Sequence, residues 1–444
     1  MYTIGQISEM FKIPVSTLRY YDREGLFPQL KRNGGVRSFG DKEIEALKVI
    51  ECLKKSGLEI REIRTFMGWC AQGSGTYPKR RDLFIRQEEV VKEEMRKLEK
   101  VLAMIRYKRW YYEEAIKDGN EERVKAMSPD RLPEEVKREN PEIVIIGAAI
   151  LDVLVRPAGE EVFHTGSSPA EEIRLSTGGD ALNEATVLAG LGRRVLLETV
   201  TGPDKAGKFI TEHCRERGIL LPEDCVREHT PTGINAVLVR RDGSRHFLTN
   251  PSGTLRSLTL EDIHMPFPKS AGILCFASIF VFPEIGPREL EMIFQKAKEQ
   301  GMTVCADMTK RKNNESVRDL APAFRFVDYL LPNDEEAMLL TGENTVEKAA
   351  EALRAAGVKN VVIKCGGRGC YLDSEEERLW IPAEKNVKCL DTTGAGDSFT
   401  AGFLHALCAK KSLRECAAYG NLCGAKAVTS VGATEWLDSE IGAC

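Results

Sequence analysis

The stretch DTTGAGDSFTAG at positions 391–402 carries the strongest chemical signal in this chain of 444 residues. A Gly-x-Gly turn at 394–396 precedes an amphipathic helical pattern, so backbone N–H groups are left free where the helix begins. Together with the helix dipole, these groups form a binding site for an anion. Asp397, in the first turn, can take a proton from a hydroxyl group that attacks a bound phosphate. It can equally be a carboxylate that only stabilises the helix end, and local chemistry leaves both interpretations open.

Apolar runs rich in β-branched residues surround this motif from residue 142 onward and alternate with amphipathic stretches. The runs are IVIIG, RVLLETV, GILCFASIF, MTVCADM, DYLLPN and NVVIKCG. Fully apolar strands separated by helices predict a parallel sheet that is covered on both faces. Between the first two runs, residues 161–176 hold shorter segments interrupted by polar residues, which predict a small accessory sheet.

The motif DTTGAGDSFTAGF resembles the C-terminal signature of the PfkB (ribokinase-like) family of carbohydrate kinases. Further family motifs follow in the expected order: GAAILD at 147–152, GGDALN at 178–183, a strand from PTG at 231–233 to RDG at 241–243, NDEE at 333–336 and VVIKCGGRG at 361–369. The resemblance covers residues 142–444. It implies an α/β ribokinase-like (Rossmann-like) sheet with helices on both faces and a small β lid.

The resemblance also implies an activity, the transfer of the γ-phosphoryl group of ATP to a sugar or a sugar-like alcohol. Asp397 would be the general base. The N–H groups that would stabilise charge on the phosphoryl group are those of Gly394, Ala395 and Gly396. Asn333 and Glu336 would organise Mg²⁺ and its waters, since oxygen ligands suit a hard cation that keeps most of its hydration.

Other matched positions would bind the sugar and the nucleotide. The residues implied for the substrate are Asp152, Gly178, Gly179 and Asn183. Those implied for the nucleotide, besides the Mg²⁺ pair Asn333 and Glu336, are Lys364, Gly366, Gly369 and Asn421, with Asn421 near the adenine. A carboxylate accepts two hydrogen bonds from hydroxyl groups, and glycine lets a sugar approach the backbone.

Asp391 and Thr393 match a monovalent-cation site of the family. Its other ligands would be carbonyl groups around Ala427, Ser430 and Gly432. Trp436 stands near a position where a small polar residue is common, so dependence on K⁺ stays open. Two departures leave ribose and fructose open as well: DMTKR at 307–311 replaces a D-P-N-x-R pattern, and FASIF at 276–280 lacks an acidic residue.

The N-terminal part differs from the rest in charge. Residues 1–117 hold 24 Lys and Arg against 17 Asp and Glu, a net charge of +7, whereas the remainder carries −11. This asymmetry suggests that the basic end meets a polyanion. Helical patterns at 2–10 and 15–21 have helix-turn-helix spacing. A basic turn, KRNGG at 31–35, is flanked by a strand-like run and predicts a wing.

TIGQISEMFKIPVSTLRYYDREGLFPQLKRNGGVRSFGDKEIEALKVI resembles the DNA-binding domain of the MerR family. The resemblance covers about 70 residues and implies a winged helix-turn-helix domain over 1–75 that binds double-stranded promoter DNA and bends and untwists it. The implied DNA contacts are Thr17, Arg19, Tyr20 and Arg37. Of the two adjacent tyrosines, Tyr21 is expected to pack in the core.

A helix is predicted over 78–118, because the region from residue 80 to 117 contains neither Pro nor Gly. Its apolar positions have the spacing of a coiled coil: Val91, Met95, Leu98, Leu102, Ile105 and Tyr112. The family resemblance implies an antiparallel homodimer through this helix, whereas an amphipathic helix that lies on its own domain is the alternative. A polar, Pro-containing linker is expected at 119–141, followed by the kinase domain at 142–444.

The remaining features argue for a cytoplasmic protein. The N-terminus lacks the pattern of a signal peptide, and no apolar run is long enough for a membrane span. The 13 cysteines have no zinc-site spacing and are expected to be reduced thiols.

Three functions compete on these grounds. The first is an active sugar kinase that also regulates transcription. The second is a regulator that uses a kinase-like fold only as a sugar or nucleotide sensor. The third is a kinase whose basic head serves only for dimerisation.

Overall fold

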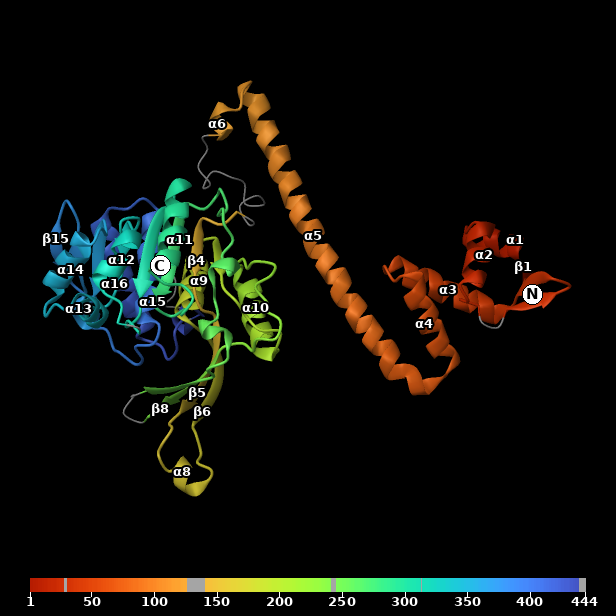
Figure 1. Cartoon of the computed structure of the whole chain (residues 1–444), viewed down its shortest axis with the longest axis horizontal. Helices are drawn as coiled ribbons and strands as arrows, with labels where there is room; N and C mark the ends of the chain where they lie inside the picture. The colour runs from red at the N-terminus through yellow and green to blue at the C-terminus, as the bar shows by residue number, and fades with distance from the viewer. Residues whose placement is uncertain (28–29, 126–139, 241–244, 313, 439–444) are drawn as a thin grey trace. The chain divides into compact units, whose positions relative to one another are not determined.

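The chain divides into two compact units, Met1–Glu121 and Glu122–Cys444, which Figure 1 draws as ribbons. The computed structural model describes the chain apart from residues 28–29, 126–139, 241–244, 313 and 439–444. Most of the predicted linker at 119–141 therefore lies outside the described residues. In the described part of this predicted linker, a short helix α6 covers Glu122–Lys125.

The first unit begins with a small α/β fold. Its helices are α1 (Ile4–Phe11), α2 (Val15–Arg23), α3 (Asp41–Lys55) and α4 (Ile60–Ala71), and its three-stranded sheet consists of β1 (Tyr2–Thr3), β2 (Lys31–Asn33) and β3 (Val36–Phe39). Thr3 caps α1, because its hydroxyl group accepts from the Gln6 N–H at 3.3 Å. The core contains Ile7, Leu18, Tyr21, Phe39 and Leu47, all buried. The helix-turn-helix and the wing formed by β2 and β3 thus share one core.

Helix α5 runs without interruption from Tyr77 to Asp118 after a 3₁₀ turn at Ser74–Thr76, where the sequence predicts a helix over 78–118. At 1.5 Å per residue it is roughly 60 Å long. Leu83 packs into the core of the first unit. Further along, apolar side chains of α5 are exposed: Val91, Met95, Leu98, Leu102, Ile105 and Tyr112.

The second unit contains an eight-stranded sheet in the order β15-β14-β13-β12-β11-β10-β4-β7. The parallel strands are β4 (Ile143–Ile146), β7 (Val195–Glu198), β10 (Ile273–Ile279), β11 (Thr303–Met308), β12 (Tyr329–Leu330) and β13 (Asn360–Lys364). These are the six strands that the apolar runs predict. The sheet is nevertheless mixed, because β14 (Cys370–Asp373) and β15 (Arg378–Ile381) continue it in antiparallel fashion. A tight turn after β13 allows the antiparallel pair, where a crossover helix would be needed for a parallel one.

Helices cover both faces of this sheet, as predicted. One face packs against α11 (Pro287–Glu299), α12 (Val317–Phe324), α13 (Asp334–Thr341) and α14 (Val346–Ala355). The other packs against α9 (Asp180–Gly190), α10 (Lys205–Arg217), α15 (Ala395–Cys408) and α16 (Leu413–Ala427). Short 3₁₀ helices cover Thr254–Arg256, Leu260–Asp262, Gly366–Arg368 and Glu435–Asp438. Burial of both faces explains why the strand sequences are continuously apolar.

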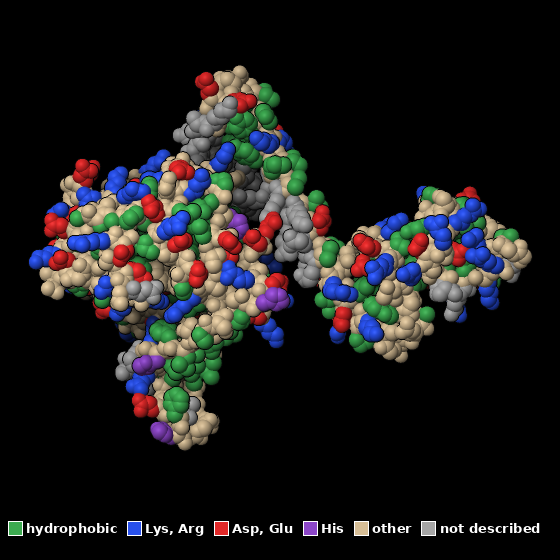
Figure 2. All heavy atoms as spheres, in the orientation of Figure 1, with side chains coloured by type: hydrophobic (Ala, Val, Ile, Leu, Met, Phe, Trp, Pro, Cys, Tyr) green, Lys and Arg blue, Asp and Glu red, His purple; other side chains and the backbone are tan. Residues whose placement is uncertain are grey.

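A second sheet, the lid, extends from this unit, with the short helix α8 (Val162–Thr165) at its tip (Figure 1). Its order is β6-β5-β8-β9, from β5 (Ile150–Arg156), β6 (Glu172–Gly178), β8 (Ile234–Val239) and β9 (Arg245–Thr249). Hydrophobic side chains gather over these strands in Figure 2. Ile173, Leu175, Phe247 and Leu248 are all exposed.

Candidate active site and DNA-binding surface

The first turn of α15 forms the centre of the candidate site. Gly394 caps the helix with φ 68°, and a Cβ atom there would come within 2.7 Å of Ala433, so glycine is required. The first intrahelical hydrogen bond runs from Ser398 N to Gly394 O at 2.8 Å. The N–H groups of Ala395 and Gly396 come before it and lack intrahelical acceptors. Ala395 N makes only a long turn contact of 3.3 Å to Thr392 O, which leaves an anion cradle at the helix N-terminus.

Asp397 lies in this turn and is half-buried. Asn183 of α9 donates from Nδ2 to Asp397 Oδ2 at 2.7 Å. Burial and the nearby Asp180 carboxylate raise the pKa of Asp397 well above its usual range, while the Asn183 hydrogen bond and the Lys364 charge oppose the shift. A carboxylate with a raised pKa is a stronger base than an ordinary one. The side chain is therefore suited to accept a proton next to the cradle.

A buried cation lies close to the same cradle. Lys364, the last residue of β13, forms an ion pair with Asp307 at the end of β11. Thr400 Oγ1 donates to Asp307 Oδ2 at 2.8 Å, which holds that carboxylate in place. Lys364 Nζ lies 3.6 Å from where a Cβ atom of Gly396 would be. Burial lowers the pKa of Lys364, but the Asp307 and Glu336 carboxylates outweigh it and raise the pKa to about 12, so the ammonium group stays charged.

The predicted Mg²⁺ residues form the N-cap of α13. Asn333 Oδ1 accepts from Glu336 N at 2.9 Å, and Glu336 Oε2 accepts from Asn333 N at 2.9 Å. Burial and the Asp307 carboxylate raise the pKa of Glu336 to about 7. This cap requires only Oε2, so the other carboxylate oxygen remains for a water of a hydrated cation. Oxygen donors of this kind fit Mg²⁺.

The predicted substrate residues meet where β5 joins the body. A Cβ atom at Gly178 would lie 2.2 Å from the Asp152 carboxylate, so this glycine leaves room for that side chain. Asp152 Oδ1 and Asn183 Oδ1 are both buried and have no hydrogen-bond partner among the described residues. Burial is the main reason why the pKa of Asp152 is raised to about 6. The hydrogen bond with Asn235 lowers this pKa, and the charge of the Asp180 carboxylate raises it further. Buried acceptors without donors fit the hydroxyl groups of a ligand.

Three predicted binding residues also have structural tasks. A Cβ atom at Gly179 would lie 2.5 Å from Ala148 O, and its φ is 92°. At Gly369 it would lie 2.0 Å from Ile381 O. Asn421 is buried and donates to Ile381 O and Pro382 O, both at 3.2 Å. In this structure their contacts hold the backbone together, and Gly366 begins the 3₁₀ turn next to Gly369.

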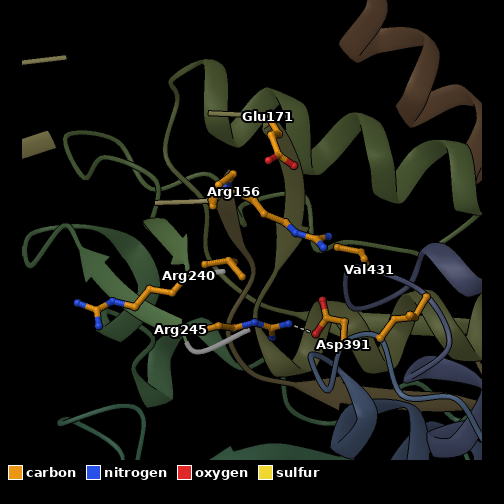
Figure 3. Close-up of a pocket in the computed structure, with 9 residues that line it drawn as sticks. Arg156, Glu171, Arg240, Arg245, Asp391 and Val431 are labelled. Carbon is orange, nitrogen blue, oxygen red and sulfur yellow. Dashed lines mark hydrogen bonds and ion pairs between the residues drawn. The ribbon is translucent and has the colours of Figure 1, made fainter. Parts of the chain in front are cut away.

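The predicted cation residues have an unexpected partner. Asp391 is buried and accepts from Thr393 N at 2.7 Å, from Thr393 Oγ1 at 2.8 Å and from Gly432 N at 2.9 Å. The guanidinium group of Arg245, the first residue of β9, also forms an ion pair with Asp391 (Figure 3). An arginine therefore stands where the sequence suggests a monovalent cation, and the residues present do not fit that ion.

On the first unit, the predicted DNA contacts separate into two kinds. Arg19 and Tyr20 on α2 are exposed and Thr17 is half-buried. Arg37 of the wing is instead tied to Asp22 of α2, Nε to Oδ2 at 2.6 Å, and Arg32 reaches the same oxygen at 3.0 Å.

Tyr21 is buried, as predicted. Its hydroxyl group donates to Glu51 Oε1 at 2.9 Å and accepts from Lys54 Nζ at 2.9 Å. The aromatic pair thus divides into one exposed and one core residue. Lys and Arg side chains are spread over the surface of this unit (Figure 2).

Sequence reasoning missed several residues of the site. Asp180 accepts a hydrogen bond from the Ser278 hydroxyl group. Its negative charge contributes to the raised pKa values of both Asp152 and Asp397. The sequence could have indicated Asp180, since this residue directly follows the two glycines at 178–179. The partnership of Lys364 with Asp307 and that of Arg245 with Asp391 had no local signal, because the partners are 57 and 146 positions apart.

Comparisons with known proteins agree with this division. The family model described as pfkB family carbohydrate kinase matches residues 140–440, and the model described as MerR HTH family regulatory protein matches residues 2–68. A ribokinase from Haemophilus influenzae is 27% identical over 275 residues, covering 59% of this chain and 84% of the relative. An uncharacterized HTH-type transcriptional regulator from the same organism is 34% identical over 134 residues, covering 30% of this chain and 97% of the relative.

Among solved structures, an Arabidopsis thaliana ribokinase complexed with ribose and ATP superposes with a TM-score of 0.55 at 26% identity. The matched region covers 67% of this chain and 95% of the ribokinase. Within the described residues, no helix is both long and apolar enough to span a bilayer. No group of three or more His, Cys, Asp or Glu side chains in that part of the chain forms a metal site.

Proposed function

Since this chain belongs to the pfkB family of carbohydrate kinases and carries a MerR HTH domain at its N-terminus, we propose that it phosphorylates a sugar or sugar-like alcohol with ATP and also binds promoter DNA. The observation that carries the kinase proposal is that a site for a phosphate and a candidate general base lie next to each other. An anion cradle at the start of α15 lies beside Asp397, and Asn183 connects Asp397 to the unpartnered acceptor oxygens.

In the proposed reaction, a substrate hydroxyl group attacks the γ-phosphorus of ATP. Asp397 takes the hydroxyl proton, an oxygen–phosphorus bond forms, and the bond to the β–γ bridging oxygen breaks to release ADP. The N–H groups of Gly394, Ala395 and Gly396, together with the Lys364 ammonium group, stabilise the charge on the phosphoryl oxygens. Asn333 and Glu336 would hold Mg²⁺ through its waters, and the ion would supply charge neutralisation on the phosphates.

The substrate would lie between α9 and the end of the lid sheet where β5 joins the body. Asp152 Oδ1 and Asn183 Oδ1 offer two buried acceptors, which two neighbouring hydroxyl groups can satisfy at once. Gly178 and Gly179 keep the strand end close to that space. Gly366, Gly369 and Asn421 shape the backbone on the nucleotide side. The Arabidopsis thaliana ribokinase of this fold was solved in complex with ribose and ATP, which supports ATP as the donor.

The first unit would bind DNA with α2 in the major groove. Thr17, Arg19 and Tyr20 are exposed or half-exposed on that helix, and the pair of Arg37 with Asp22 sets the wing against it. Helix α5 would form a homodimer, because its exposed apolar side chains have the spacing with which a second helix packs in a coiled coil. Leu98→Glu should then convert a dimer to monomers in sedimentation velocity, and Glu94→Gln, an exposed position on the same helix, should leave the dimer intact.

The kinase proposal is tested by a ligand screen on the purified full chain. Pentoses, hexoses and nucleosides are added one at a time in the presence of MgATP, and thermal unfolding and ADP release are followed. We expect at least one polyol to raise the unfolding temperature and to release ADP. Asp152→Asn should lose both effects for that polyol and keep the stabilisation by MgATP. Stabilisation by ligands without ADP release would favour a sensor instead of an enzyme.

A further inference from the structure

Asp391, at the start of the cradle motif, has a positive partner from a distant strand. The side chain of Arg245 is 18% exposed and that of Asp391 is 3% exposed, so this ion pair is shielded from water. A buried carboxylate is strongly unfavourable without a compensating charge. Arg245 supplies that charge from the lid, across the junction that Figure 3 shows.

The acceptor capacity of the Asp391 carboxylate is also used. Oδ1 receives Thr393 N, Thr393 Oγ1 and Arg245, and Oδ2 receives Gly432 N. An ionised carboxylate has about four acceptor positions, and four donors are present. A metal ion that bound Oδ1 would have to displace one of its three donors.

Neighbouring carbonyl oxygens that could complete a cation site are engaged too. Val431 O accepts from Arg174 Nη2 at 3.2 Å, and Arg174 also pairs with Glu172 at 3.6 Å and with Glu435 at 3.3 Å. Val428 O accepts from Leu390 N at 2.7 Å and from Asp391 N at 3.3 Å. A monovalent cation at Asp391 would therefore meet the positive charge of Arg245 beside two carbonyl groups that already accept hydrogen bonds.

From these contacts we propose that Arg245 takes the place of a monovalent cation at the loop before the anion cradle, so that phosphoryl transfer by this chain does not require K⁺. The inference rests on the proposed kinase function. Arg245 is a positioning residue: it fixes Asp391, and Asp391 fixes Thr393 and Gly432 on either side of the turn that begins at Gly394. The lid strand β9 is thereby anchored to the cradle as well.

The space around the pair provides a way to test this. A cavity of about 310 Å³ borders it, lined in part by Arg156, Arg240, Leu390 and Val431. Shortening Arg245 to alanine would open the Asp391 carboxylate to this cavity, which is large enough for a hydrated K⁺ ion. The loss of the guanidinium group should thus create a cation site that the natural chain lacks.

The kinetic experiment compares KCl with choline chloride at equal ionic strength in the full chain, with MgATP and the polyol identified in the screen. We expect the natural protein to have the same kcat in both salts. Arg245→Ala should lose about 100-fold in kcat in choline chloride, because small displacements of a reacting group cost that much, and KCl should restore a large part of it.

Arg240→Ala is the matched control. Arg240 lines the same cavity, but its side chain extends away from Asp391 (Figure 3) and pairs with Glu160 at 2.5 Å. This variant should keep the natural kcat and show no response to K⁺. A response equal to that of Arg245→Ala would mean that general loss of positive charge, and not the position of Arg245, produces the effect, and it would overturn the proposal.

A second readout does not depend on catalysis. Thermal unfolding is followed while KCl replaces choline chloride, and K⁺ should stabilise Arg245→Ala and leave the natural protein unchanged. Stabilisation or activation of the natural protein by K⁺ overturns the proposal, even if the variant does not fold. A folded Arg245→Ala that K⁺ neither stabilises nor activates overturns it too. If no polyol is phosphorylated, the kinase function fails, and the unfolding data still decide the role of Arg245.

Discussion

Asp391 and Asp397 stand at the two ends of one seven-residue motif, yet their surroundings differ in kind. Asp391 is buried and receives four donors, including a guanidinium group. Asp397 is half-buried, receives Asn183, and faces the Asp180 carboxylate, which together with burial raises its pKa. A carboxylate saturated with donors holds a loop in place. A carboxylate with few donors and a like charge nearby keeps its capacity to take a proton.

The largest effect is expected at Asp397, the carboxylate with fewer hydrogen-bond donors. Asp397→Asn keeps the size of the side chain and removes the base, so kcat should fall by about 10²–10⁴-fold. Affinity for ATP should change little, because the cradle consists of backbone N–H groups. Steady-state kinetics and calorimetric titration with ATP measure the two quantities. Weak ATP binding in the variant would show that Asp397 organises the cradle and is not only a base.

At the saturated end, the main effect should be on stability. Asp391→Asn leaves the buried guanidinium group of Arg245 without its charge partner, and breaking such a pair costs about 3–5 kcal/mol in the free energy of unfolding. Urea denaturation gives this value. Glu160→Gln breaks the exposed pair with Arg240 and should cost at most about 1 kcal/mol. Similar costs for the two variants would contradict the difference in burial.

Asp152 gives a test in which function and stability move in opposite directions. Its pKa of about 6 lies above the ordinary 3.8, so the folded state favours the protonated form. The stability that protonation contributes is fully present below pH 3.8 and is lost as the pH rises through 6. Asp152→Asn removes this loss and should stabilise the free protein by about 3 kcal/mol at pH 7.5, and not at pH 3.8.

The same substitution should abolish substrate binding, and in the natural protein KM should rise as the pH falls below 6, because the ionised carboxylate accepts the hydroxyl groups. Urea denaturation at the two pH values and KM as a function of pH measure these effects. An Asp152→Asn protein that is less stable at pH 7.5 would assign the side chain a structural role.

The smallest effect concerns the first unit, where Arg37 is tied and Arg19 is exposed. Arg19→Ala should weaken promoter binding, lower the salt slope by about one unit, and leave the thermal stability unchanged. Arg37→Ala should weaken binding and also loosen the wing, because it breaks the contact with Asp22. Fluorescence titration with promoter DNA at several salt concentrations measures both. Kinase activity should be unchanged in either variant.

Much of this architecture follows from short-range patterns. The six parallel strands are apolar because helices cover both faces, so each is visible in the sequence as a mainly apolar run of five to nine residues. The hairpin of β14 and β15 was missed, because each strand has only four residues and β15, with Trp380, is the edge strand of the sheet.

Local motifs likewise led to the prediction of Asp397, Asn183, Asp152 and the pair of Asn333 with Glu336 as site residues. They could not show which partner each charge has in space. Lys364 meets Asp307 from another strand, and Arg245 reaches Asp391 from the lid. Both pairs depend on the assembled sheet and have no spacing rule in the sequence. The prediction of a cation site at Asp391 therefore came without the Arg245 partner on which our proposal of a K⁺-independent site rests.

The central claim is that the α15 turn and Asp397 transfer a phosphoryl group to a polyol. It is tested most directly by ³¹P NMR of the full chain with MgATP and the polyol selected in the ligand screen. The account predicts that ADP and a phosphate monoester of the polyol appear together, and that Asp397→Asn forms neither at a comparable rate. Monoester formed equally fast by the variant, or ATP converted only to ADP and inorganic phosphate by the natural chain, would contradict it.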